Sequence, residues 1–147
     1  MKFICPRHRQ RYTEYPERAR DMWYHLMTAA SESVLQGDWQ EAVYYFGNAL
    51  DLAELVLDLE PSSSMAQERY ASTALDMAYV LKASKMPVDW LLAAVAERLS
   101  DRHITDPVSE LWQSLRALEK PVADKVLPLW QSVARSNVAA GYPERFH

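Results

Sequence analysis

The stretch Gly37-Asp38-Trp39-Gln40-Glu41-Ala42 decides the fold that this sequence predicts. Glycine is favoured just past the end of a helix, because it adopts the left-handed conformation without a steric penalty. Asp38 can accept a hydrogen bond from the amide of Glu41, and the Glu41 side chain can reach back, as in a capping box. The stretch therefore predicts one helix that ends at Gly37 and a second that starts at position 39.

Apolar side chains recur three and four positions apart on both sides of this turn, which is the spacing of one helical face. Pro16 suits the first position of the preceding helix, because the amide that it lacks has no partner there. The following helix is predicted to run to Leu59, and Glu60-Pro61 stops it. The two predicted core faces comprise Met22, Trp23, Leu26, Ala29, Ala30, Ser33 and Val34, and Trp39, Ala42, Val43, Phe46, Ala49, Leu50, Ala53, Val56 and Leu57.

Four further helices are predicted to begin near Ser62–Ser64, Pro87, Asp106-Pro107 and Pro121. The three serines offer N-caps, and Ser64 with Gln67 forms a second possible capping box. Pro128 should kink or split the last helix, and Gly141 ends it. No segment alternates strictly between apolar and polar residues. The predicted fold class is therefore all-α, with about six helices packed as antiparallel pairs.

The predicted organisation is a basic N-terminal arm at 1–15, a single helical domain at 16–141 and a tail at 142–147. A length of 147 residues suits one domain with its own core. The arm shows no clear period, so we expect it to be irregular, or to form a short strand that docks on the helical domain.

Composition excludes several classes of protein. Three glycines, spread through the chain, leave no Gly-rich phosphate loop, and a net charge of −4 gives no global attraction to nucleic acid or anionic membranes. The single cysteine, Cys5, excludes an internal disulfide and is typical of a reducing compartment. No apolar run approaches the ~20 residues of a membrane span. We expect a cytoplasmic protein.

The charges are unevenly distributed along the chain. Residues 1–20 carry six basic residues, whereas residues 21–68 carry nine acidic residues and no lysine or arginine. Asp51, Glu54 and Asp58 follow one another at helical spacing within the second predicted helix. Three interpretations of these carboxylates stay open: a solvated surface, a surface that binds protein, and a site for a divalent metal ion.

The turn and its two helices resemble a tetratricopeptide repeat over about residues 23–52. The matching residues are Leu26 and Ala30 in the first helix, Gly37-Asp38-Trp39-Gln40-Glu41-Ala42 in the turn, and Phe46 and Ala49-Leu50 in the second helix. Glu54 stands where the motif expects a proline, and no second repeat is readable. The resemblance implies a scaffold that binds other proteins. In size and acidity the chain is similar to type III secretion chaperones of the tetratricopeptide class.

Signatures of catalysis or cofactor binding are missing from the sequence. Cys5 and His8 have the spacing of half a zinc site, but no second pair completes the four ligands. Asp21 with His25 and Glu144 with His147 are isolated pairs, and no Gly-x-Ser-x-Gly nucleophile motif occurs. We therefore expect a protein that is not an enzyme and that carries neither a cofactor nor a metal.

The predicted function is that of an adaptor or chaperone that binds a peptide or helix of a partner protein. The candidate binding residues are Tyr44, Tyr45, Asp51, Glu54 and Asp58, with Arg7, Arg9 and Arg11 of the arm. One alternative is a nucleic-acid-associated regulator, because these arginines alternate with aromatic residues in the arm. A second alternative is a small metal-dependent helical hydrolase. Under the leading hypothesis, the acidic hairpin at 21–68 receives a basic segment, either the chain's own Arg7–Arg11 or a partner's.

Overall fold

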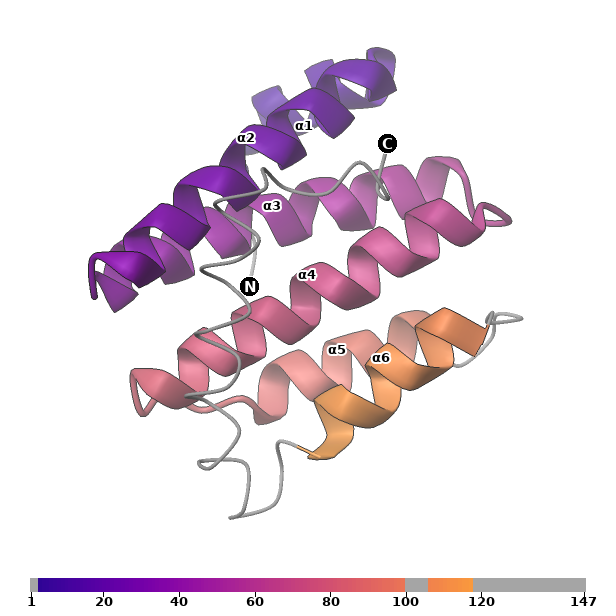
Figure 1. Cartoon of the computed structure of the whole chain (residues 1–147). Coiled ribbons are helices and arrows are strands. Elements are labelled where there is room, and N and C mark those ends of the chain that lie inside the picture. The colour runs from indigo at the N-terminus through magenta and orange to yellow at the C-terminus, as the bar shows by residue number, and fades with distance from the viewer. Residues whose placement is uncertain (1–2, 100–105, 118–147) are drawn as a thin grey trace.

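Every secondary-structure element in the computed structural model, which describes residues 3–99 and 106–117, is an α-helix (Figure 1). The helices are α1 (Pro6–Glu14), α2 (Pro16–Leu35), α3 (Trp39–Leu59), α4 (Ser64–Ala83), α5 (Asp89–Leu99) and α6 (Asp106–Ala117). The all-α prediction is confirmed. The helix predicted from Pro121, its end at Gly141 and the tail at 142–147 lie outside the described residues.

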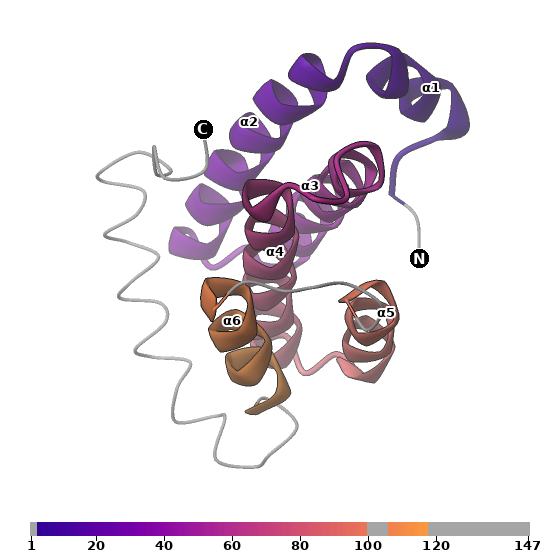
Figure 2. The ribbon, with the colours of Figure 1, turned by 90° about the vertical axis from the view of Figure 1, so that its right-hand side faces the viewer.

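The helices alternate between two layers along the chain (Figure 2). One layer holds α2, α4 and α6, and the other holds α1, α3 and α5. The most extensive packing joins α2 to α3 and α3 to α4, as short connections favour. The helix α6 packs chiefly against α4, and α5 contacts α4 less extensively. As a result α3 lies in the middle of its layer, with α1 on one side and α5 on the other.

The turn between α2 and α3 follows the sequence closely. Gly37 has a φ of 76°, and the Asp38 amide donates to the Ser33 carbonyl at 2.9 Å, which is a Schellman ending. Asp38 Oδ1 accepts from the Glu41 amide at 3.0 Å, which confirms the N-cap. The Glu41 side chain does not complete the capping box, because the Asp38 amide already has a partner. Its carboxylate accepts a hydrogen bond from Tyr45 instead, which raises the pKa of that phenol.

Seven of the buried side chains of α3 and α4 are alanines. We call this set the alanine seam, and it consists of Ala42, Ala49, Ala53, Ala66, Ala71, Ala74 and Ala78, each almost wholly buried. Larger side chains belong to the same core, among them Phe46 and Met27, both at 0% exposure. Trp23 links α2 to α4 within their layer, because its Nε1 donates to Thr73 Oγ1 at 2.9 Å. Arg69 lies over the Trp23 ring at 5.4 Å, and burial lowers the pKa of its guanidinium.

The ends of α4 show two departures from the expected caps. Its N-cap is Ser63, whose Oγ accepts from the Ala66 amide at 3.2 Å, so the predicted Ser64 box does not form. At the other end Met86 donates to the Leu81 carbonyl at 2.8 Å, which is another Schellman ending. The left-handed residue there is Lys85, with a φ of 59°, where glycine is usual.

The N-terminal arm is helical, which corrects the prediction of an irregular segment or a strand. Cys5 is the N-cap of α1, and Pro6 occupies its first turn. No residue of α1 is buried, and only Arg9 and Tyr12 are partly covered. Because so few of its side chains face the protein, the arm carries no apolar period that a reading of the sequence could detect.

Candidate functional site

Most of the candidate binding residues on α3 lie on one face of that helix. Tyr44, Gly47, Asp51, Glu54 and Asp58 follow one another at steps of three and four, and we call this set the α3 stripe. Tyr44 stands at its N-terminal end and is 58% exposed. Tyr45 lies off the stripe and is half-buried, with its ring 5.7 Å from that of Tyr44 in an edge arrangement.

The middle of the α3 stripe holds the chain's own N-terminal segment. The amides of Phe3 and Ile4 both donate to Asp51 Oδ2, the second at 2.9 Å. Asp51 is only 3% exposed, so its carboxylate faces the segment rather than solvent. Charge-assisted hydrogen bonds of this kind are roughly twice as strong as neutral ones. One buried carboxylate therefore binds the backbone of two successive residues.

Gly47 provides a flat surface for the aromatic ring of Phe3. A Cβ added at Gly47 would meet three ring atoms of Phe3, each at 2.5 Å. Because these three separations are equal, the added carbon would lie over the face of the ring. Glycine within a helix costs ~0.5–1 kcal/mol relative to alanine. Here the absence of a side chain allows the ring to lie directly on the α3 backbone.

The C-terminal half of the α3 stripe binds arginines from both neighbouring helices. Arg98 of α5 donates to Asp58 at 2.7 Å and to Glu54 at 3.0 Å. Arg9 of α1 lies 3.9 Å from Glu54 and 4.0 Å from Asp58. The closest counter-charge for Glu54 and Asp58 thus comes from Arg98, and that of Arg9 is the longer-range one, whereas Glu60 of the acidic hairpin pairs with Arg20 at 2.8 Å.

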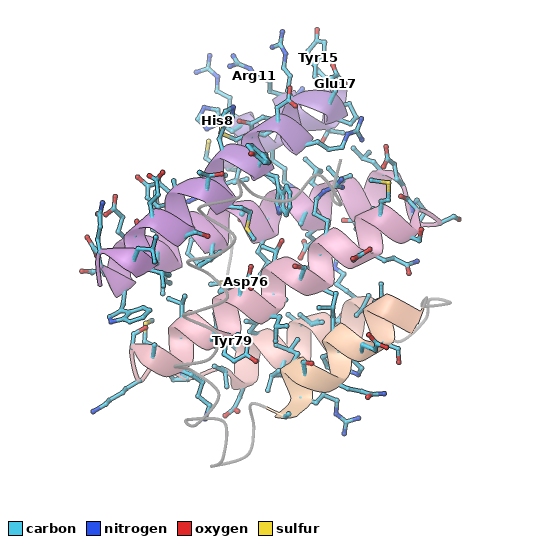
Figure 3. All side chains as sticks on the ribbon, in the orientation of Figure 1. His8, Arg11, Tyr15, Glu17, Asp76 and Tyr79 are labelled. Carbon is cyan, nitrogen blue, oxygen red and sulfur yellow. The ribbon has the colours of Figure 1, made fainter. Side chains whose placement is uncertain are left out.

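The other candidate residues of the arm lie apart from the α3 stripe. Arg7 and Arg11 are exposed, and Figure 3 shows His8 and Arg11 at the outer edge of the molecule, remote from Tyr79 of α4. Cys5 Sγ lies 3.3 Å from His8 Nδ1, and both side chains are exposed. Of the three arm arginines, only Arg9 therefore faces the acidic residues.

Three components of the site were not among the residues that the sequence singled out. Phe3 and Arg98 lie 40 or more positions from their partners on α3, and their pairing depends on how the helices are layered. Gly47 did carry a signal, because a glycine in the interior of a strongly periodic helix has an energetic cost. Such a residue indicates close approach by another group.

Comparisons with protein-family models, with curated proteins and with solved structures returned no match. None of the helices in residues 3–99 and 106–117 combines the length and the apolar character that a bilayer-spanning helix requires. In the same ranges, histidine, cysteine, aspartate and glutamate side chains form no group of three or more that could hold a metal ion.

Proposed function

We propose that this protein is a non-catalytic adaptor or chaperone that binds a peptide or helix of a partner protein on the α3 stripe. The observation that carries the proposal is the seating of residues 3 and 4 on this surface. Asp51 accepts from two successive backbone amides there, and Gly47 contacts an aromatic ring. Recognition of backbone groups together with one anchoring side chain is typical of peptide-binding sites.

The arrangement of the helices supports a scaffold role. Successive helices alternate between two layers (Figure 2), so each layer grows by one helix per hairpin. The alternation supports the proposal because helical-repeat proteins also stack successive hairpins, and these present extended binding surfaces. It agrees with the resemblance of residues 23–52 to a tetratricopeptide repeat. The proposal places the protein in the cytoplasm, whose reducing conditions suit its exposed free cysteine, Cys5.

The experiment that tests this proposal measures peptide binding with the arm removed. Residues 1–12 are deleted, and the truncated protein is titrated with a fluorescent peptide of that sequence at 50 mM and at 1 M salt. We expect saturable binding that weakens at high salt, because the Debye length falls to ~3 Å at 1 M. A truncated protein carrying Glu54→Gln and Asp58→Asn is the control, and it should bind less tightly. The absence of binding at low salt to this and to other basic peptides would remove the proposal.

A further inference from the structure

The docked N-terminal segment, residues 3–9, shows what chemistry the α3 stripe selects. We propose that this segment is a built-in competitor, and that the partner carries an aromatic residue, two successive free backbone amides and an arginine six positions after the aromatic. The spacing is that of Phe3 and Arg9 in this chain. The inference rests on the proposed function and adds to it the class of ligand and the means by which access to the site is controlled.

The aromatic requirement follows from Gly47. A face-on ring fits against this residue because no Cβ projects from it, and even the methyl group of alanine would stand 2.5 Å from the ring atoms. An aliphatic side chain is not flat and cannot approach the helix backbone as closely. The glycine therefore selects a planar group at this position of the ligand.

The backbone requirement follows from Asp51. Two successive amides converge on one of its oxygens, and neither Phe3 nor Ile4 belongs to a helix. Amides in the interior of a helix are bonded to carbonyls of the same helix and are not available. In this chain the free pair occurs just before Cys5, the N-cap of α1. The ligand is therefore a non-helical segment with an aromatic residue that continues into a basic helix.

The helical part of the docked segment is held loosely, which makes the segment displaceable. No residue of α1 is buried, and the ion pairs of Arg9 with the α3 stripe are the long ones, at 3.9 and 4.0 Å. Its tether still gives it an effective concentration of order mM, and a free ligand must compete with it. The apparent affinity for a partner is then reduced by the fraction of molecules in which the segment is docked.

Tyr44 favours a partner protein over a second copy of this chain as the occupant. This ring lies at the end of the α3 stripe beyond Gly47 and remains 58% exposed while residues 3–9 are docked. A segment exchanged from a second copy would repeat the contacts described for residues 3–9. A partner segment with further residues before its aromatic residue gains a contact with the exposed ring of Tyr44. This added contact favours displacement of the arm.

The test uses the full-length chain and a labelled, N-acetylated peptide with the sequence of residues 3–14, whose acetyl group restores the amide of the phenylalanine, together with the same peptide in which this phenylalanine is alanine. Fluorescence anisotropy compares wild type, Phe3→Ala, and Phe3→Ala combined with Gly47→Ala. We expect Phe3→Ala to bind the phenylalanine peptide about five- to tenfold more tightly than wild type. Gly47→Ala should remove most of that gain, and the alanine peptide should bind weakly to all three. Asn48→Ala, one position along α3, is the control and should leave the gain intact.

The possible outcomes separate this inference from the proposed function. If no peptide binds to any variant at low salt, the proposed function fails as a whole. If both peptides bind equally well and neither substitution matters, the site recognises charge alone and the present inference is wrong. If the wild type is a dimer that Phe3→Ala dissociates, the occupant is a second copy, which also overturns it. Circular dichroism confirms that each variant retains its helices.

Discussion

Alanine in place of Gly47 should change the stability of this protein with opposite signs in two backgrounds. In the interior of a helix, Gly→Ala stabilises by ~0.5–1 kcal/mol, because alanine loses less conformational entropy on folding. In the wild type, however, the added methyl group would stand 2.5 Å from the ring of Phe3. Ordinary carbon contacts lie at ~3.5–4 Å, so the ring must withdraw by about an ångström or leave.

The burial of Phe3 sets the size of the opposing effect. Its side chain is half-buried, and full burial of a phenylalanine is worth ~1.5–3 kcal/mol, so its docking contributes ~1–1.5 kcal/mol. Gly47→Ala should therefore lower the free energy of unfolding of the wild type by ~0–1 kcal/mol. In a Phe3→Ala chain the ring is absent, and the same substitution should raise it by ~0.5–1 kcal/mol.

A double-mutant cycle measures this coupling. It compares the urea denaturation of the wild type, both single variants and the double variant, followed by tryptophan fluorescence. We expect a coupling energy of ~1–1.5 kcal/mol between the two positions. Gly47→Ala that stabilises both backgrounds equally would show that the ring does not lie on Gly47, and the argument for aromatic selection would fail with it.

Four further substitutions test the fold. Phe46→Ala should lower the free energy of unfolding by ~3–5 kcal/mol in urea melts, because Phe46 is 0% exposed and a cavity remains; a loss below ~1 kcal/mol would refute its core position. Asp38→Ala should cost ~0.5–2 kcal/mol by the same measurement, and an unchanged midpoint would contradict the N-cap. Lys85→Gly should stabilise by ~0.5–1 kcal/mol, because the left-handed position no longer carries a side chain; destabilisation would count against the Schellman ending. Burial raises the pKa of the Tyr79 phenol, and the nearby Asp76 adds a smaller effect in the same direction. Above pH ~10 the unfolded chain therefore loses this proton before the folded protein does, and the free energy of unfolding falls as the pH rises. Tyr79→Phe should make that fall shallower in melts between pH 9 and 11, and an unchanged slope would refute the assignment.

The hairpin of α2 and α3 could be predicted from the sequence because its signals are local. Gly37 and Asp38 form the turn with their own backbone and side-chain chemistry, and Phe46 lies on an apolar face whose period is read directly. The start of α2 at Pro16 and the end of α3 at Leu59 follow from the same kind of signal. In such segments neighbouring residues determine the structure.

The candidate site could be predicted only in part, because it is assembled from distant segments. Asp51, Glu54 and Asp58 were found because they share one helix. Their partners Phe3 and Arg98 are distant from α3 in the sequence, one on each side of it, and nothing in their sequence neighbourhood indicates α3. Charge balance showed that residues 21–68 need basic partners without showing that an arginine of α5 is the nearest one.

The alanine seam of α3 and α4 determines the size of side chain that this protein tolerates at seven buried positions. Residues such as Ala49, Ala53 and Ala74 are at 0% exposure, so each added methylene must displace a neighbour. Overpacking of this kind typically costs ~1–3 kcal/mol, comparable to a large part of the stability of a small domain. A saturation scan should therefore show these positions accepting glycine and serine but rejecting valine, leucine and isoleucine. These positions do not select for hydrophobicity, because valine, leucine and isoleucine are more hydrophobic than alanine and should still be rejected. The property that these positions require is a small side-chain volume.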